Sequence, residues 1–352
     1  MKVSAVDLFC GIGGLSYGFK KSGINVKAGI DFDPSCQYAY ESNCDSKFIH
    51  ADISHIQKED IVQYFNEDEV KVLVGCAPCQ PFSTYTLKGD KHKDQRWQLL
   101  YEFTRLIKET QPEIVSMENV PNLLNFKKEA VFETFVSDLK KEGYHVWYDI
   151  VYSPNYGIPQ KRKRLVLLAS KKGKIQLIPP THKPEKYITV KDAIGDLEKI
   201  EAGKSSAKDF IHKASKLSEK NLKRLRQSTQ GGSWRDWDEN LKLECHKKES
   251  GKTYGSVYGR MKWDEPSPTM TTFCVGIGNG RFGHPEQDRA ISLREAGILQ
   301  SFPVDYKFAS NANTLKLRQV AKQIGNAVPP KLGEVIGLSI IKHLQGFENK
   351  KN

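Results

Sequence analysis

The sequence predicts an α/β protein with an open sheet and a second, smaller and irregular domain. Short β-branched runs alternate with segments of helical periodicity across residues 3–169, which is the pattern of strands and crossover helices. Several runs end in glycine or polar residues, and open α/β sheets bind their ligands at the carboxyl ends of the strands. The alternation is lost from Lys171 onward. We therefore expect one large domain at residues 1–180, completed by 308–352, and a smaller one at 181–307.

The individual elements follow from local pattern. Apolar β-branched runs predict strands at residues 3–9, 26–30, 70–74, 114–117, 146–152 and 165–169. Apolar residues at helical spacing predict helices at residues 15–21, 99–108 and 131–141.

The composition is that of an ordinary globular protein. With 352 residues, 38% hydrophobic and 27% charged, the chain can bury a full core. No run approaches the length needed to span a bilayer, and the amino terminus lacks a signal-peptide pattern, so we expect the protein in the cytoplasm. Seven scattered cysteines fit a reducing compartment. The net charge of +12 is compatible with a polyanionic partner, although solvated surface lysines would give the same charge.

Glycines follow the first expected strand in the run Cys10-Gly11-Ile12-Gly13-Gly14. Glycine here lets the backbone approach a ligand closely. The second strand ends in Asp31, twenty residues beyond Gly11, the distance at which nucleotide-binding folds place a carboxylate on ribose hydroxyls. The glycine pattern alone is weak evidence for nucleotide binding, because Gly-x-Gly-Gly differs from the Gly-x-Gly-x-x-Gly fingerprint of dinucleotide-binding folds. A third strand end offers Asp52 and Ile53 to an adenine, although a helix N-cap explains Asp52 as readily.

The stretch from Gly75 to Ser83 comes directly after the expected buried strand at 70–74. Pro78 and Pro81 break the strand ladder on both sides of Cys79 and present this cysteine at the carboxyl end of the strand. The neighbouring side chains are polar, which suits an exposed nucleophile better than a core position. A small buried hydrophobe is the ordinary alternative for a cysteine.

Cys76 and Cys79 form a Cys-x-x-Cys pair, which also occurs in redox and zinc sites. A zinc site would need a second pair or nearby histidines, and the other five cysteines are solitary. A thioredoxin-like pair opens a helix, whereas Gln80-Pro81-Phe82 follows here. Both interpretations are therefore disfavoured. The polar, basic segment at 84–96 is typical of a functional lid.

Charged residues also border two later strands. Glu118 follows the strand at 114–117 and precedes a proline, a position with few structural explanations other than a surface ion pair. Arg162 and Arg164 precede the strand at 165–169 and would share one side of an extended chain. Arginine forks there suit carbonyl or phosphate oxygens, although a solvated strand end is the ordinary alternative.

Taken together and in this order, these motifs resemble the cytosine-C5 DNA methyltransferase family, in its bacterial restriction-modification form. The resemblance is carried by residues 7–14, 31–33, 78–83, 118–120, 160–164, 294–303 and 323–330. It covers nearly the whole chain except roughly 171–250. It implies an S-adenosylmethionine-dependent, Rossmann-like methyltransferase with a mixed sheet. The large domain would then be catalytic and cofactor-binding, and the small one would recognise the DNA target.

The resemblance also implies a mechanism. Cytosine C5 is a poor nucleophile, so Cys79 would first add to C6 of the base. Glu118, through a protonated carboxyl, would hydrogen-bond N3 and the exocyclic amine. Arg164 would hold O2, and Arg162 would support Arg164 and the catalytic loop. The base must leave the stack to be attacked, so base flipping is implied.

The cofactor contacts carry over residue by residue from the resemblance. The methionine moiety would be surrounded by Phe9, Gly11 and Gly13, and the ribose would be bound by Asp31. The adenine would contact Phe32 and Ile53, and its amino group would contact Asp52. Pro78 would pack against the cofactor or base, and the pocket would be closed by Asn326 and Val328. The chain departs from the family pattern at Asp31, where many members have Glu, and at Ala327, where Ser is frequent.

The variable segment is the expected source of sequence specificity. Nine Lys or Arg residues stand against three acids between Lys199 and Arg226, which suits a phosphate-tracking face or an ordinary solvated helix. Irregular stretches rich in Gly, Arg and Thr follow, and such stretches can contact base edges. The expected DNA contacts are Arg235, Arg260 and Arg281, together with Ser83 of the catalytic loop.

We expect double-stranded DNA as the partner, no metal, no membrane, a monomer, and a cognate restriction endonuclease acting on the same site. The nearest alternative is a tRNA cytosine-C5 methyltransferase of the same fold. A nicotinamide-dependent oxidoreductase would bind a nucleotide without affinity for DNA, and a non-catalytic DNA binder would transfer no methyl group.

Overall fold

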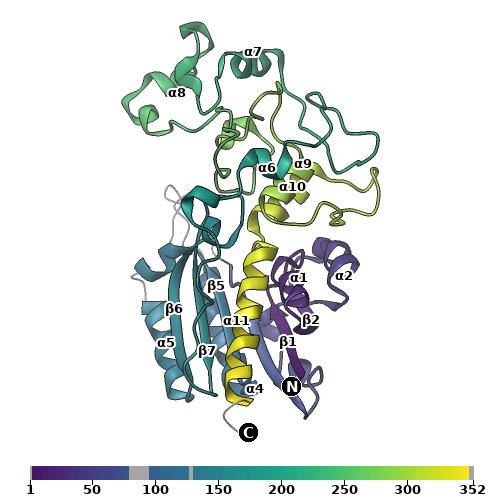
Figure 1. Cartoon of the computed structure of the whole chain (residues 1–352), viewed down its shortest axis with the longest axis vertical. Coiled ribbons are helices and arrows are strands. Elements are labelled where there is room, and N and C mark those ends of the chain that lie inside the picture. The colour runs from purple at the N-terminus through teal and green to yellow at the C-terminus, as the bar shows by residue number, and fades with distance from the viewer. Residues whose placement is uncertain (1, 79–94, 127–129, 349–352) are drawn as a thin grey trace. The chain divides into compact units, whose positions relative to one another are not determined.

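The computed structural model describes residues 2–78, 95–126 and 130–348 (Figure 1). Within these residues, seven strands form one sheet of order β3-β2-β1-β4-β5-β7-β6. The strands are β1 Lys2–Leu8, β2 Asn25–Asp31, β3 Lys47–His50, β4 Glu69–Gly75, β5 Ile114–Asn119, β6 His145–Tyr152 and β7 Lys163–Ser170. Strands β1 to β5 pair in parallel, whereas β7 is antiparallel to both β5 and β6. The expected α/β fold with a mixed sheet is confirmed.

The register of the central strands sets which residues meet at the carboxyl edge. Leu8, the last residue of β1, pairs with Gly75, the last of β4, and Gly75 pairs with Met117 of β5. The residues that follow these positions therefore leave the sheet side by side. The strand order reverses between β1 and β4, and α/β sheets bind ligands at such a switch point.

The chain divides into two compact units. Unit 1 comprises Met1–Tyr156, Lys163–Thr181 and Ala327–Asn352, and unit 2 comprises Gly157–Arg162 and His182–Asn326. The sequence predicts residues 308–352 in the large domain, whereas in the structure residues 308–326 group with unit 2.

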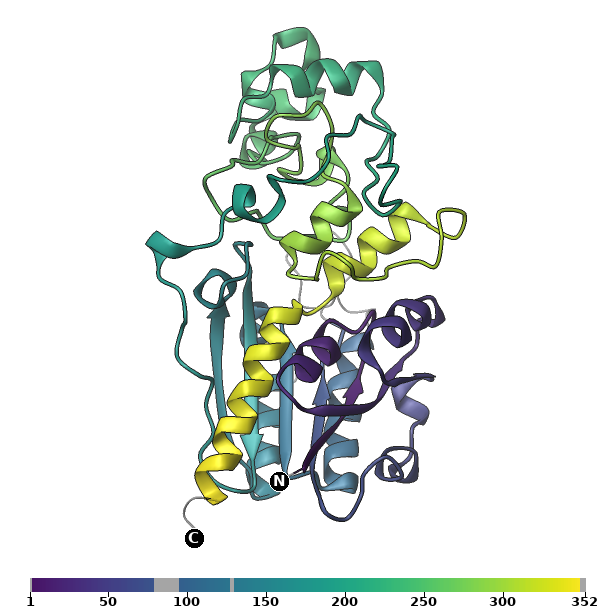
Figure 2. The ribbon, with the colours of Figure 1, turned by 45° about the vertical axis from the view of Figure 1, so that its right-hand side comes forward.

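Helices cover both faces of the sheet in unit 1. Its helices are α1 Gly14–Lys21, α2 Gln37–Cys44, α3 Lys58–Val62, α4 Leu99–Thr110, α5 Val131–Lys141 and α11 Pro330–Glu348, with 3₁₀ turns η1 Pro34–Cys36, η2 Ile53–His55, η5 Gln95–Gln98, η6 Pro121–Asn125 and η8 Ser153–Tyr156. Phe103 of α4 and Phe135 of α5 stack with ring centroids 5.8 Å apart in a core shared with Leu73 and Val115 of the sheet. Helix α11 crosses the opposite face beside α1 (Figure 2).

Helices α1 and α11 meet backbone to backbone. A Cβ atom on Gly18 would lie 2.2 Å from the carbonyl oxygen of Pro330, and one on Gly333 would lie 2.8 Å from that of Leu15. Because only glycine fits such an approach, these residues anchor the carboxyl-terminal helix to the first helix of the chain.

Unit 2 is irregular, as expected for the second domain. Its helices are α6 Val190–Ile194, α7 Glu219–Gln227, α8 Glu244–Lys247, α9 Leu293–Leu299 and α10 Leu317–Asn326, with 3₁₀ turns η9 Pro184–Lys186, η10 Trp234–Asp236, η11 Glu239–Leu241, η12 Glu249–Thr253 and η13 Ile277–Asn279. Arg289 and Glu295 form a fully buried pair, with Nη1 and Oε2 2.6 Å apart. Glu295 also accepts from the backbone N–H of Ser292, the N-cap of α9. The Arg294-Glu295-Ala296 motif is therefore part of the internal support of this unit.

None of the helices in the described part of the chain combines the length and the apolar character needed to cross a membrane.

Candidate active site

The glycine loop after β1 is tied to the end of β2. Phe9, Gly11 and Gly13 all have positive φ angles, of 62°, 52° and 84°. The backbone N–H of Gly11 donates to Asp31 Oδ2 at 2.8 Å, and that of Asp33 donates to Oδ1 at 2.8 Å. Partial burial raises the pKa of Asp31, opposed by these two hydrogen bonds. The structure thus brings together Gly11 and Asp31, which the sequence analysis paired as nucleotide-binding residues.

The loop also has room for a ligand. A Cβ atom on Gly11 would meet no described atom within 4 Å. The glycine loop therefore borders open space beside a carboxylate, which fits the methionine and ribose parts of S-adenosylmethionine.

The three residues expected to contact the adenine differ in solvent exposure. The ring of Phe32 is 71% exposed and lies beside His50, with centroids 6.3 Å apart. Asp52 Oδ1 accepts from the backbone N–H of Ser54 at 2.9 Å and caps η2, so the N-cap alternative describes its local role. Hydrogen bonds from the Ser54 side chain and backbone lower the pKa of Asp52. Ile53 is buried in the core of unit 1.

Glu118 lies at the carboxyl edge of β5 between two partners. Its side chain is 3% exposed. Arg164 Nε of β7 lies 3.0 Å from Glu118 Oε1. On the other side, the thiol of Cys76 donates to Glu118 Oε2 at 2.9 Å. The expected acid and one of the expected arginines are therefore in contact.

The chain that follows β4 is held by its neighbours at Cys76 and Ala77. The backbone N–H of Cys76 donates to the carbonyl of Leu8 at 3.3 Å. The amide Nδ2 of Asn119, a residue 1% exposed, donates to the carbonyl of Ala77 at 3.0 Å. Cys79, the expected nucleophile, and Ser83 lie outside the described residues.

Arg162 differs from Arg164 in its surroundings. It is 2% exposed and belongs to unit 2, where Nη1 donates to the carbonyl of Met270 at 3.1 Å and Nη2 to that of Gly325 at 3.3 Å. These contacts tie residues 157–162 to the rest of unit 2. A Cβ atom on Gly325 would lie 2.3 Å from the carbonyl oxygen of Thr271, so glycine is required there for packing.

The two residues expected to close the cofactor pocket fall in different units. Asn326 is the last residue of α10 in unit 2 and is exposed. Val328 belongs to unit 1 and is buried.

The three arginines expected to contact DNA are not equivalent. Arg235 is exposed, with its guanidinium 5.4 Å from the ring centroid of Trp234. Arg281 is partly buried and donates to the carbonyls of Gly232 and Gly255.

The prediction that Arg260 contacts DNA is wrong. This residue is 5% exposed, and its nitrogens bind the carbonyls of Leu225, Ser228, His284 and Gln287 and the carboxylate of Asp288. A guanidinium enclosed in this way supports the fold of unit 2 and does not present a side chain to a base edge.

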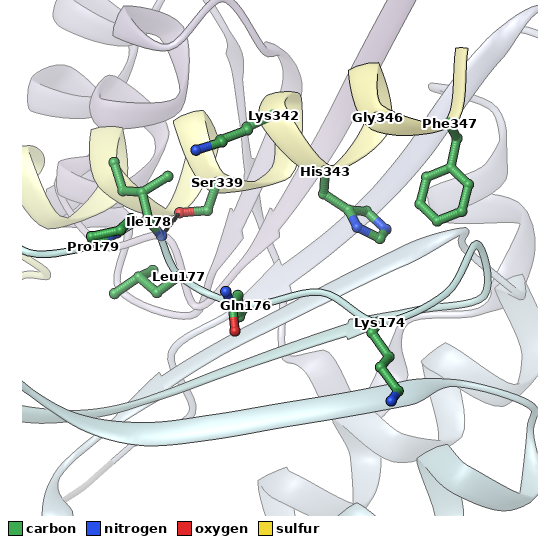
Figure 3. Close-up of a pocket in the computed structure, with 10 residues that line it drawn as sticks. All are labelled: Lys174, Gln176, Leu177, Ile178, Pro179, Ser339, Lys342, His343, Gly346 and Phe347. Carbon is green, nitrogen blue, oxygen red and sulfur yellow. Dashed lines mark hydrogen bonds between the residues drawn. The ribbon is translucent and has the colours of Figure 1, made fainter. Parts of the chain in front are cut away.

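A cavity of about 350 Å³ in unit 1 lies away from these residues, between residues 174–179 and the second half of α11 (Figure 3). His343 Nε2, in its wall, lies 2.8 Å from Ser170 Oγ. Ser170 pairs with Ile114, the first residue of β5. The cavity therefore borders the amino ends of the parallel strands, opposite the edge that carries Glu118.

The sequence motifs did not single out the side chain of Asp7, a buried carboxylate close to the glycine loop. Asp7, in β1, is 1% exposed, and burial raises its pKa to about 7. Ser16 Oγ donates to Asp7 Oδ2 at 2.6 Å, while Oδ1 has no hydrogen-bond partner among the described residues. A carboxylate near the end of a largely apolar strand was the available signal.

A mixed seven-stranded sheet of this order, with a glycine loop after β1 and a carboxylate at the end of β2, defines a Rossmann-like methyltransferase. A solved structure of a DNA modification methyltransferase encoded within a prophage, from E. coli, has this fold. It superposes with a TM-score of 0.74 and 23% sequence identity, over 98% of this chain and 100% of that chain.

The chain matches the model of the C-5 cytosine-specific DNA methylase family over residues 3–342 and belongs to this family. It is 53% identical over 348 residues to the Type II methylase M.HgiDII of Herpetosiphon aurantiacus, covering 99% of this chain and 98% of that protein. It is 31% identical over 345 residues to the Type II methyltransferase M1.HphI of Haemophilus parahaemolyticus, covering 97% and 87%. The protein is a DNA cytosine-C5 methyltransferase, and the resemblance in the sequence is confirmed.

Proposed function

We propose that this protein transfers a methyl group from S-adenosylmethionine to C5 of a cytosine flipped out of a specific duplex DNA sequence, through a covalent bond between Cys79 Sγ and C6. The observation that carries the proposal is the arrangement around Glu118. A buried carboxylate is paired with Arg164 at the switch-point edge of the sheet and contacts Cys76, three residues before Cys79.

In the proposed mechanism, the Cys79 thiolate adds to C6 while the protonated carboxyl of Glu118 donates its proton to N3. The electron pair displaced from the C5–C6 bond makes C5 nucleophilic. When bound, S-adenosylmethionine would supply the electrophilic methyl group that C5 takes, and S-adenosylhomocysteine would be the leaving group. A base removes the proton from C5, the Cys79 thiolate leaves C6, and N3 returns its proton to Glu118. Arg164 holds O2 and Glu118 in one plane.

Cofactor binding falls to the loop after β1 and its neighbours. Gly11 and Gly13 approach the methionine moiety, with Phe9 beside it, and Asp31 accepts from the ribose hydroxyls while it holds the loop. The adenine is assigned to Phe32, Ile53 and Asp52, and the remaining contacts to Pro78, Asn326 and Val328. The exposed ring of Phe32 supports its assignment, because a free aromatic face can stack on a purine.

Target recognition falls to unit 2, and DNA contacts to Arg235, Arg281 and Ser83. Arg260 is left out because its nitrogens are engaged inside the unit. The Type II designation of the two relatives supports a role beside a cognate restriction endonuclease. We propose a monomer, with Arg162 supporting Arg164, two residues further along the chain, and the catalytic loop.

The test is methyl transfer from a labelled donor to duplex DNA of mixed sequence, with tRNA as the competing acceptor. The proposal predicts label in 5-methylcytosine of DNA, none in tRNA, and none in DNA with the Cys79→Ala variant. Label in tRNA alone would favour the tRNA methyltransferase alternative. Label in DNA with the variant as active as the wild type would contradict the covalent route.

A further inference from the structure

We propose that Cys76 is a positioning residue, which orients the carboxyl group of Glu118 before the target base arrives. The inference rests on the proposed function, because the orientation of Glu118 matters only if the protein acts on a cytosine. It concerns a residue that takes no part in the proposed chemistry itself.

The geometry places one side chain on each oxygen of the carboxylate. Arg164 Nε is 3.0 Å from Oε1, and Cys76 Sγ is 2.9 Å from Oε2. The terminal torsion of a glutamate is broad and roughly two-fold, so an ion pair to one oxygen alone leaves the plane of the carboxylate poorly defined. The Cys76 thiol supplies a directed hydrogen bond to the other oxygen, and this bond selects one orientation of the plane.

The backbone holds the thiol where this contact requires it. Cys76 follows the last residue of β4, and its N–H donates to the carbonyl of Leu8 at 3.3 Å. The next carbonyl, that of Ala77, accepts from Asn119 Nδ2 at 3.0 Å. Because Asn119 adjoins Glu118 in β5, the segment carrying the thiol is tied to β1 through Leu8 and to the strand carrying the acid through Asn119.

A thiol suits this role because its hydrogen bond is weak. S–H is a poor donor compared with N–H or O–H, and Glu118 is 3% exposed, so water gives its carboxylate little competing support. The hydrogen bond from Cys76 can therefore orient Oε2 in the free enzyme. When a cytosine binds, this bond can break with a small loss of free energy, and Oε2 can then bind the edge of the base. Preorganised groups of this kind lower the reorganisation needed at the reacting centre.

The experiment compares Cys76→Ala, Cys76→Val and Cys76→Ser in the full chain. Alanine and valine both remove the hydrogen-bond donor, and valine keeps more of the side-chain volume. Serine keeps a hydrogen-bond donor on a side chain of similar shape to cysteine. The exposed Cys245 supplies the matched control, Cys245→Ala, for loss of a thiol as such. For each protein we would measure kcat, the KM for duplex DNA and for S-adenosylmethionine, and the midpoint of thermal unfolding.

The expected result is a loss of about threefold to tenfold in kcat for Cys76→Ala and Cys76→Val, in the range for one ordinary hydrogen bond. Both KM values should stay within about twofold, and Cys76→Ser should recover most of kcat. Cys245→Ala should match the wild type.

Two outcomes would overturn the inference. One is a kcat of Cys76→Ala and Cys76→Val equal to that of the wild type. The other is a Cys76→Ser variant as slow as Cys76→Ala, which would assign the effect to packing. If Cys76→Ala or Cys76→Val fails to fold, a Cys76→Ser variant that folds but remains slow would also contradict the inference. A wild-type protein that transfers no methyl group to DNA would instead refute the proposed function, so the two failures are distinguishable.

Discussion

Glu118 shows how a single residue is prepared for chemistry in this fold. A carboxylate 3% exposed loses most of its hydration, and this loss must be offset by partners inside the protein. Arg164, itself 12% exposed at the side chain, supplies a positive charge, and Cys76 supplies a donor. Removing one member of such a group leaves the others uncompensated. Glu118 is thus held in place by the same contacts that would orient it toward a base.

Glu118→Gln tests its assigned role. The amide keeps the size and the polar character of the side chain but cannot deliver a proton to N3, and general acid catalysis contributes about 10²- to 10⁴-fold. We expect a loss of kcat in that range with DNA affinity within a few-fold of the wild type, measured by single-turnover methyl transfer and by titration with labelled duplex. An unchanged kcat would exclude Glu118 as the acid.

Asp7 predicts a pH effect on stability. Its pKa is about 7 in the folded protein, raised by burial from 3.8. Between these values the folded state keeps a proton that the unfolded chain has released, so the free energy of unfolding falls as the pH rises from about 4 to about 7. Asp7→Asn cannot ionise and should lack this fall. Urea unfolding at several pH values checks it, and identical pH slopes for the two proteins would contradict the assignment.

At the scale of elements, local pattern predicted most strands and helices of unit 1, because alternating apolar runs are a local property of the chain. Glu118 could be singled out because a charged residue after a buried strand is unusual. Its contact with Cys76 could not, because that contact depends on the register in which Gly75 pairs with Met117. Arg260 shows the same limit, since its burial depends on carbonyls contributed by distant parts of unit 2.

The contact between α1 and α11 predicts a stability effect. Gly18→Ala would place a Cβ atom 2.2 Å from the carbonyl oxygen of Pro330, so the helices must separate, at a cost of about 1–3 kcal/mol. Gly346→Ala is the matched control, because a Cβ atom there meets no described atom within 4 Å. It should be neutral or slightly stabilising. Thermal unfolding compares the two, and equal midpoints would contradict the close approach.

At the scale of the whole molecule, the net charge of +12 favours a polyanionic partner, but charge alone does not say which cations touch it. The structure separates two kinds of arginine in unit 2. Arg235 is exposed, whereas Arg260 is bound to carbonyls and to Asp288 inside the unit. Exposed cations contribute to DNA affinity through release of counterions, and buried ones contribute to the fold.

Alanine variants of these two arginines should therefore affect different properties, one DNA binding and the other stability. Arg235→Ala is expected to weaken duplex binding several-fold and to reduce its salt dependence, with the unfolding midpoint unchanged. Arg260→Ala is expected to lower the unfolding midpoint, because the buried carbonyls of Ser228 and His284 and the carboxylate of Asp288 each lose a hydrogen bond. Binding titrations at several salt concentrations and thermal unfolding provide the measurements. The reverse pattern would contradict the assignment.

The most direct test of the whole account is a covalent trap. Duplex DNA of mixed sequence, synthesised with 5-fluorocytosine in place of cytosine, is incubated with the protein and S-adenosylmethionine and then analysed under denaturing conditions. Because fluorine at C5 cannot leave as a proton does, Cys79 would remain bound to C6. The account predicts a stable protein–DNA adduct with the wild type and none with Cys79→Ala. It would be contradicted if the wild type methylated ordinary DNA without forming an adduct, or if Cys79→Ala formed one.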